Sequence, residues 1–234
     1  MNRICGEKIS IVSPVPQTTR HSIRGIYSEE RGQLVFVDTP GLHKSTRKFN
    51  SRMQHVVGGT LDDVDVILYL LDATRPPAEE EAHVLSLVES SSLPVVTAIN
   101  KMDADKTRYE LARDWLQLHS SRGVEHPIPL SARTGDGVLE LLTALFAAAP
   151  EGEPMYPAEF YTDQDPEFRC QEIIREQAIL RTREELPHSV YVKVEDMEEE
   201  DAAKEGGQAR LWIRASVMVE RESQKGIVVG KGGA

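Results

Sequence analysis

The chain has few cysteines: Cys5 and Cys170 are the only two among its 234 residues, and neither belongs to a CxxC pair or to a cluster with histidine. This scarcity excludes a disulfide framework and a zinc site of the usual spacing, and it is typical of a reducing cytosol. Long apolar runs are also lacking, since none approaches the roughly 18 residues of a membrane span. Because MNRICGEKIS has no apolar signal core, the sequence predicts a cytoplasmic protein, for which peripheral contact with the inner face of the cell membrane stays open.

Positive charge is in deficit as well. The chain has 27 Lys and Arg residues against 38 Asp and Glu residues, which gives a formal net charge of -11. This balance argues against a protein that holds nucleic acid through a broad basic surface, so any contact with RNA would have to be local. Hydrophobic residues make up 40% of the chain, which is enough at this length for one large domain and one small one.

Short apolar runs alternate with longer amphipathic stretches through residue 150. The runs cover residues 34–37, 65–73, 94–100 and 126–132, and polar residues end each of them. This rhythm predicts buried strands of a mostly parallel sheet that helices cover. Because ligands of such open sheets bind beyond the carboxyl ends of the strands, we expect the chemistry where these runs end.

The composition changes after residue 150. Residues 151–166 are rich in Pro, Asp and Glu, which predicts a linker of moderate stiffness. A helical pattern then covers residues 167–186, and segments 189–197 and 209–220 alternate apolar and polar residues. These two segments predict an antiparallel strand pair joined by an acidic turn, so the second domain begins in the order α-β-β.

The first run ends in the motif DTPG. In a phosphate site, Asp38 would hold Mg²⁺, usually through water, and the amide of Gly41 could approach a γ-phosphate because glycine has no Cβ. Upstream, Thr19 in QTTR suits a Mg²⁺ ligand and a γ-phosphate sensor on a mobile loop. Both motifs have a structural alternative: a proline-glycine turn for DTPG, and a threonine pair at the start of an edge strand for Thr19.

The third run ends in NKMD, which comprises Asn100, Lys101, Met102 and Asp103. Asp103 could accept hydrogen bonds from the N1–H and the N2 amino group of guanine, whereas adenine offers an unprotonated N1 and no N2 group. A site built in this way rejects adenine, because a mismatch leaves polar groups unpaired. Asn100 could contact the other edge of the base and the stem of Lys101 its face. The alternative is an ordinary polar loop at a strand end.

The fourth run ends in Leu130, Ser131 and Ala132, one βα unit after NKMD. Backbone N–H groups at these small residues could contact the O6 atom of guanine. The alternative is a helix N-cap at Ser131 or Thr134. Ser131 and Ala132 therefore indicate a guanine contact only because they follow NKMD by one βα unit.

In this order, the threonine loop, DTPG, NKMD and Ser-Ala form the pattern of a GTPase domain, and the chain closely resembles the Era family of translation-associated GTPases. The resemblance rests on residues 7–26, VDTPGLH, NKMD, LSARTGDGV, YTDQDPEFRCQEIIRE and SVMVERESQKGIVVGKGG. It implies an α/β fold: a P-loop-type GTPase domain with a mostly parallel sheet, followed by a partial α+β KH domain. The domains would cover residues 1–150 and 167–234, with a linker at residues 151–166.

The resemblance also implies GTP and Mg²⁺ as cofactors. Thr19 and Asp38 would hold the metal and, with Gly41, serve catalysis. The nucleotide would be bound by the residues of the three motifs, namely Asp38, Thr39, Pro40, Gly41, Leu42, Asn100, Lys101, Met102, Asp103, Leu130, Ser131 and Ala132. Leu42 stands where some GTPases have a water-orienting glutamine, so hydrolysis should be slow without help from other groups.

In that family the second domain is an RNA-binding KH module, whose GxxG loop clamps the backbone of about four nucleotides. Here the loop corresponds to Gly230, Lys231, Gly232 and Gly233. The implied partners are 16S rRNA near its 3′ end and the 30S subunit, which a monomeric protein would help to assemble. The alternative for these residues is a flexible glycine tail.

One family motif is missing: the chain contains no GxxxxGK[ST], the loop whose amides and lysine cradle the phosphates. Against the family pattern, the chain also lacks the central first strand and the last elements of the KH module, and it resembles an interior part of a longer protein. We therefore expect a GTPase by family whose 234 residues alone bind GTP weakly or not at all. The alternative is a non-catalytic RNA-binding fragment that has lost nucleotide binding.

Overall fold

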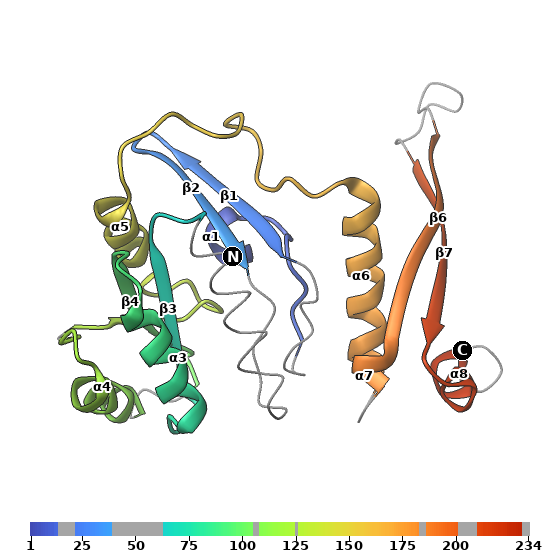
Figure 1. The fold of residues 1–234 in the computed structure, drawn as a ribbon. Helices are drawn as coiled ribbons and strands as arrows, with labels where there is room; N and C mark the ends of the chain where they lie inside the picture. The colour runs from blue at the N-terminus through green and yellow to red at the C-terminus, as the bar shows by residue number, and fades with distance from the viewer. Residues whose placement is uncertain are drawn as a thin grey trace.

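The computed structural model describes residues 1–13, 22–38, 63–104, 108–124, 126–182, 186–200 and 210–230. Two groups of elements meet along helix α6 (Pro166–Arg181), as Figure 1 shows. The first group has small sheets with helices beside them, and in the second α6 packs on a strand hairpin. The predicted α/β fold is confirmed, with parallel strands in the first group and the order α-β-β in the second.

The strands of the first group form two sheets. The antiparallel hairpin consists of β1 (Ile23–Glu29) and β2 (Gly32–Asp38), and the parallel sheet has the order β3 (Ile67–Asp72), β4 (Val95–Asn100) and β5 (Ile128–Pro129). The helices that the structure describes in this group are α1 (Asn2–Cys5), α3 (Glu79–Ser90), α4 (Arg108–His119) and α5 (Val138–Ala148). Because β3, β4 and β5 are parallel, their carboxyl ends lie at one edge of the sheet.

Both faces of the parallel sheet bury apolar side chains. On one face, Leu71 and Ile99 pack in a cluster with Leu116 of α4, and on the other, Ala98 packs with Leu141 of α5. None of these residues is more than 2% exposed. Neighbouring residues Ala98 and Ile99 serve opposite faces because side chains alternate along a strand, so β4 is fixed in its position from both sides.

Two strands differ from the prediction. β2 forms over the apolar run 34–37, but every one of its residues is only half-buried, because within the described ranges β2 pairs with β1 alone and belongs to a separate sheet from β3. β5 covers two residues of the run 126–132. Pro127 and Pro129 account for its shortness, since proline has no N–H to donate to a strand ladder.

The segment between the two groups is attached to the β1–β2 hairpin. The Ile26 N–H donates to the Tyr161 carbonyl at 2.9 Å, and the Thr162 hydroxyl donates to the Arg24 carbonyl at 2.7 Å. An ion pair joins Arg24 and Asp163 at 2.8 Å. The segment is therefore held more firmly than its composition predicts.

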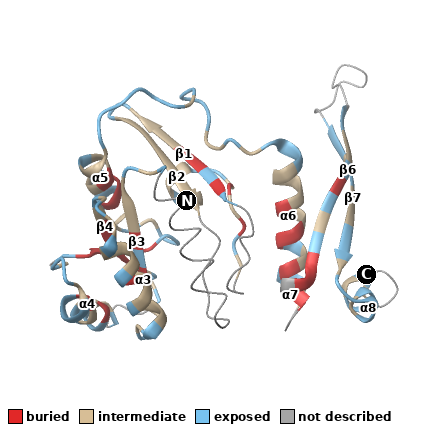
Figure 2. Ribbon diagram, in the orientation of Figure 1, coloured by how far each residue is buried: buried red, intermediate tan, exposed pale blue. Residues whose placement is uncertain are grey.

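In the second group, α6 begins at Pro166, and the side chain of Asp165 caps it by accepting from the Phe168 N–H at 2.7 Å. A short helix α7 (Leu186–Ser189) leads into the antiparallel hairpin β6 (Val190–Glu200) and β7 (Arg210–Val219), and α8 (Glu222–Val229) follows. Figure 2 shows buried residues on α6, α7 and β6. The core of this group therefore lies between α6 and β6.

Candidate functional site

The carboxyl ends of the parallel strands bring the predicted residues of NKMD and the Ser-Ala pair together. Asp72 at the end of β3 is in register with Asn100 at the end of β4, and Ile99 is in register with Pro129 of β5. Two backbone bonds join the loops that follow: the Met102 N–H donates to the Leu130 carbonyl at 3.1 Å, and the Leu130 N–H donates to the Ile99 carbonyl at 2.8 Å. The three strand ends and the loops that follow them, at residues 72–74, 100–103 and 130–132, form one rim at this edge of the sheet.

Asn100 ties two of these loops to each other. Its Oδ1 atom accepts from the Lys101 N–H at 2.7 Å and from the Ala132 N–H at 3.0 Å. Lys101 has φ 70°, the only positive φ of a non-glycine residue in the described ranges, and this left-handed conformation costs about 1–2 kcal/mol. Strain of this kind persists where the surroundings enforce it, and it is typical of binding sites.

Asp72 also belongs to this site, although the sequence patterns did not predict it. Its Oδ2 atom accepts from Lys101 Nζ at 2.8 Å, and its Oδ1 atom accepts from the hydroxyl and the N–H of Thr74. Burial raises the pKa of Asp72, but the hydrogen bonds from Lys101 and Thr74 outweigh it and hold the pKa below its ordinary value. Asp72 thus stays ionised and fixes the lysine stem beside the rim. The sequence signal that could have indicated Asp72 was its position at the end of a predicted strand.

Asp103 presents a charged, acceptor-only group at the rim. Its Oδ1 atom accepts from the Ser131 hydroxyl and its Oδ2 atom from Arg133 Nε, both at 2.6 Å. The bond from Ser131 is the main reason that the pKa of Asp103 lies below its usual range. Guanine would offer Asp103 the same kind of donors through N1–H and N2–H, and it would take over the place of the exposed Arg133 guanidinium.

Ser131 is fully buried, and it does not have the role of a helix N-cap that was the alternative for it. Its hydroxyl donates to Asp103 and accepts from the Thr134 N–H at 3.1 Å. The following helix α5 has Gly137 at its N-cap, so neither Ser131 nor Thr134 caps it. Ser131 therefore orients the carboxylate that would read the base.

Of the residues predicted to contact phosphate and Mg²⁺, the structure describes only Asp38, the last residue of β2. Burial raises the pKa of this carboxyl above its usual value. The described residues contain no group of three or more His, Cys, Asp or Glu that could hold a metal. Mg²⁺ in nucleotide sites needs only one or two protein ligands and takes the rest from phosphate and water, so one carboxylate at this position fits it. The predicted residues Thr19, Thr39, Pro40, Gly41 and Leu42 lie outside the described residues.

Gly230 is the one described residue of the predicted RNA loop. It follows α8 with φ 74°, and its N–H donates to the Gly226 carbonyl at 3.1 Å. A positive φ favours glycine at this position. The other three residues, Lys231, Gly232 and Gly233, lie outside the described residues.

Two protein-family models match the chain. The model described as 50S ribosome-binding GTPase matches residues 1–101, and the KH domain model matches residues 185–234. The first match contains DTPG and ends at Lys101, the second residue of NKMD, and the second contains the GxxG residues. The first match thus lies in the predicted GTPase domain and the second in the predicted KH domain.

Curated relatives match the whole chain. GTPase Era of Treponema denticola is 45% identical over 235 residues, covering 100% of this chain and 78% of that protein. GTPase Era of Borreliella burgdorferi is 42% identical with the same coverage. These relatives favour a GTPase, and neither of them favours a non-catalytic RNA-binding fragment.

Solved structures give the same similarity. A crystal structure of Era in complex with MgGDPNP and nucleotides 1506–1542 of 16S ribosomal RNA is 31% identical, with a TM-score of 0.86, over 99% of this chain and 77% of that one. An Aquifex aeolicus Era variant bound to GDP and aluminium fluoride is 30% identical, also with a TM-score of 0.86.

Proposed function

The chain belongs to the Era family of GTPases, and we propose from this premise that it binds and hydrolyses GTP and binds 16S rRNA to assist assembly of the 30S subunit. The observation that carries the nucleotide part is the rim at which Ser131 donates to Asp103 and the Ala132 N–H donates to Asn100. The Asp103 carboxylate is ionised, Ser131 orients it, and its second oxygen accepts from the exposed Arg133. A carboxylate held in this way can accept hydrogen bonds from guanine.

For the rest of the nucleotide we propose the residues of the first two motifs. Asp38 and Thr19 would hold Mg²⁺, which when bound neutralises charge on the transferred phosphoryl group. The Gly41 amide would contact the γ-phosphate, with Thr39, Pro40 and Leu42 beside it. Leu42 cannot polarise water, so other groups must position the attacking water, and single-turnover hydrolysis assays on a Leu42→Gln variant would show whether a glutamine there raises the rate.

We propose the domain boundaries of the sequence prediction: a GTPase domain at residues 1–150, a linker at 151–166 and a KH domain at 167–234. The family matches support this division, and so does the start of α6 at Pro166. Limited proteolysis checks it, because cleavage within residues 151–166 should release two resistant fragments.

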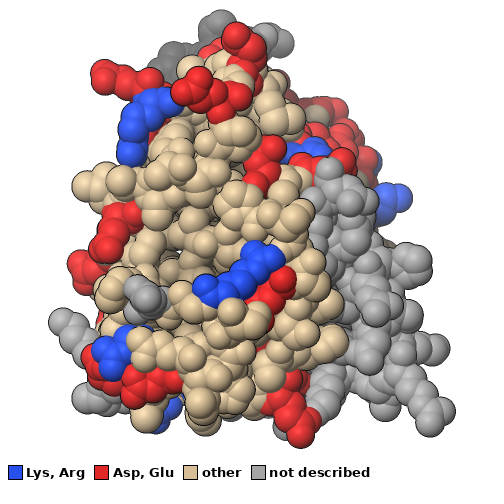
Figure 3. Space-filling view, turned by 60° about the vertical axis from the view of Figure 1, so that its left-hand side comes forward, with Lys and Arg blue, Asp and Glu red and all other residues tan. Residues whose placement is uncertain are grey.

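RNA contact is proposed for the loop of Gly230, Lys231, Gly232 and Gly233. The Era crystal structure with 16S rRNA supports this choice of partner. On the face shown in Figure 3, Lys and Arg are scattered among Asp and Glu and form no continuous basic surface, which fits a local clamp. Lys231→Ala should weaken binding to an RNA oligonucleotide of the 3′ region similarly for all sequences and reduce the salt slope by about 1. Fluorescence anisotropy at several salt concentrations measures this, and an unchanged slope would contradict it.

We propose that the protein acts as a cytoplasmic monomer that can touch the inner face of the cell membrane. No helix in the described ranges is long and apolar enough to cross a membrane. Support for peripheral contact comes from α4, where Leu111 and Leu118 are 66% and 80% exposed and lie near one helical face with Trp115. Sedimentation equilibrium checks the monomer, and co-sedimentation with anionic vesicles checks the membrane contact.

The base-reading rim makes the sharpest test of the nucleotide proposal. Ligand-observed NMR at millimolar concentration should detect GMP but not AMP, because only guanine gives Asp103 two donors. Asp103→Asn should weaken GMP binding by at least about tenfold and favour xanthosine monophosphate, whose C2 carbonyl accepts from the new amide. Asp114→Asn makes the same charge change on the outer face of α4 and should leave binding unaltered. Equal signals for GMP and AMP would contradict the proposal.

A further inference from the structure

The side chain of Arg133 covers the face of Asp103 that is open to solvent. Its Nε atom donates to Asp103 Oδ2 at 2.6 Å, and the Arg133 side chain is 76% exposed whereas that of Asp103 is only 13% exposed. The other carboxylate oxygen, Oδ1, accepts from the fully buried Ser131. A base that approaches from solvent therefore meets the Arg133 guanidinium before it reaches the carboxylate.

The backbone that carries Arg133 is held in place by its neighbours. The Ser131 N–H donates to the Asp136 carbonyl at 2.9 Å, and the Gly135 N–H donates to the Ser131 carbonyl at 2.8 Å. The Thr134 N–H donates to Ser131 Oγ at 3.1 Å. Because the loop is fixed by these bonds, the guanidinium can leave the carboxylate by rotation of one side chain, without a rearrangement of the loop.

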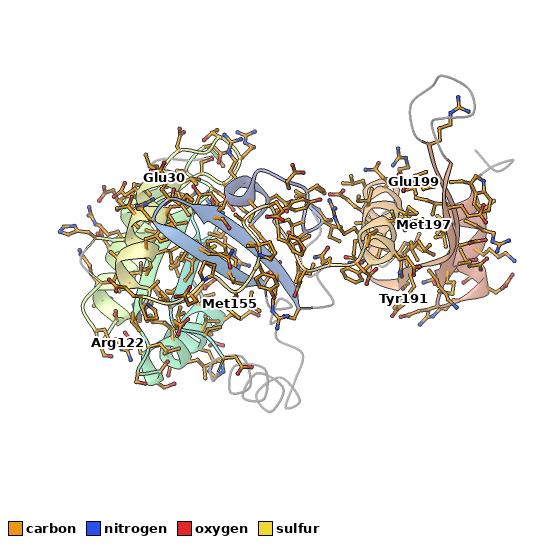
Figure 4. The ribbon with its side chains drawn as sticks, turned by 90° about the horizontal axis from the view of Figure 1, so that it is seen from above. Glu30, Arg122, Met155, Tyr191, Met197 and Glu199 are labelled. Carbon is orange, nitrogen blue, oxygen red and sulfur yellow. The ribbon has the colours of Figure 1, made fainter. Side chains whose placement is uncertain are left out.

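Another exposed arginine shows how a structural contact differs from a removable one. Arg122, labelled on the outer side of the first group in Figure 4, donates to three backbone carbonyls within residues 89–93. Within the described ranges, Arg133 has Asp103 as its only hydrogen-bond partner. Since a mostly exposed guanidinium is hydrated again when it leaves, the loss of this single bond costs little.

We propose that Arg133 is an internal competitor of guanine: its guanidinium bonds to the carboxylate that would read the base, and it must leave before the base can bind there. The inference rests on the proposed function, in which Asp103 recognises guanine. A competitor of this kind lowers the apparent affinity by the fraction of molecules in which the carboxylate is accessible to the base. For an ion pair as exposed as this one, we expect a reduction of about two- to fivefold.

The salt dependence of guanosine binding tests the proposal, because guanosine carries no charge while the ion pair is screened by salt. The affinity of the 234-residue chain for guanosine should rise about two- to fivefold between about 20 mM and about 500 mM NaCl. Arg133→Met removes the competitor, so it should have the higher affinity already at low salt and show little dependence on salt. Chemical-shift titration of the Lys101 and Ala132 amides measures both quantities.

Two further variants control for charge. Arg133→Lys keeps a cation beside Asp103 and should retain a salt dependence like that of the wild type. Arg113→Met makes the same charge change as Arg133→Met but on helix α4, where Arg113 pairs with Glu110 and Asp114. It should therefore leave both the affinity for guanosine and its salt dependence unchanged.

A titration without any ligand checks the contact itself. The hydrogen bond from Ser131 is the main cause of the low pKa of Asp103, and the bond from Arg133 adds to it. Arg133→Met should therefore raise the pKa of the Asp103 carboxyl toward its ordinary value, which carbon-13 NMR of the carboxyl groups can follow. An unchanged pKa would mean that the two side chains do not bond in solution, and it would overturn the proposal.

The binding results separate a competitor from the other roles that Arg133 could have. Weaker binding of guanosine by Arg133→Met at both salt concentrations would overturn the proposal, since the arginine would then attract the base. Equal affinities with equal salt dependence would also overturn it, but would leave the proposed guanine site standing. If neither protein bound guanosine at any salt concentration, the proposed function would fail together with the inference. Tighter, salt-independent binding by Arg133→Met, with Arg133→Lys like the wild type, supports the competitor.

Discussion

A polypeptide of residues 1–234 is expected to bind GTP more weakly than micromolar, and to bind GTP and GMP with nearly equal affinity in the presence of Mg²⁺. The chain contains no GxxxxGK[ST]. A phosphate cradle of that kind supplies about three to five charge-assisted hydrogen bonds of about 1.5 to 3 kcal/mol each, so its loss removes on the order of 5 to 15 kcal/mol. That is comparable to an entire micromolar or nanomolar affinity.

The comparison of GTP with GMP is what makes this test informative. The rim of Asn100, Asp103 and Ala132 would still contact the base, whereas the β- and γ-phosphates would find few donors. Isothermal titration calorimetry with GTP, GDP and GMP measures the difference, and ATP controls for contacts made by phosphate alone. A sub-micromolar affinity for GTP would refute the expectation and would mean that other residues replace the cradle.

The second large effect is expected from Arg175 in α6. Arg175 and Glu172 are 3% and 8% exposed, and their two hydrogen bonds measure 2.7 and 2.6 Å. Arg175→Met leaves the carboxylate of Glu172 buried without this partner and should lower the free energy of unfolding by about 3–5 kcal/mol. Replacing both residues by methionine removes the stranded charge as well, so the double variant should recover most of the loss.

Urea unfolding measures this effect in the second group of elements. A Trp115→Phe background leaves Trp212 of β7 as the only tryptophan, so its fluorescence reports on the hairpin that α6 covers. Arg181→Met, at the exposed end of α6, should cost less than about 1 kcal/mol. If the single and the double variant lost equal stability, packing of the arginine stem and not the buried charge would explain the loss.

The rim of Asn100, Asp103 and Ala132 could be predicted from the sequence because it follows from a general property of parallel sheets. Strands that end in NKMD and Leu-Ser-Ala deliver these residues to one edge, and the bonds from Ser131 to Asp103 and from Ala132 to Asn100 show that they meet. The ion pair of Asp103 with Arg133 could not be predicted, since an exposed arginine has many partners within reach. Contacts between residues distant in sequence, such as Lys8 with Glu176, leave no local pattern at all.

The extent of the strands was predicted less well than their existence. Apolar content alone indicated a buried strand at residues 34–37, but burial also depends on what pairs with the strand, and β2 stays half-buried. The two prolines at positions 127 and 129 could have indicated the short β5, because each removes a backbone donor. Position in the sheet is thus a tertiary property that a run of apolar residues does not encode.

The attachment of the segment 151–166 to β1 changes the polymer properties of that segment. A free chain of residues 151–166 would have a root-mean-square length of about 20–24 Å. Since Thr162 and Asp163 are bonded to Arg24, only Gln164 and Asp165 separate this attachment from α6, so that Asp163 and Pro166 are three residue steps or at most about 11 Å apart. Such a short tether raises the effective concentration of α6 beside residues 8–12 to millimolar or above. The two domains would then remain close to each other, and a weak contact between them can persist without a large interface.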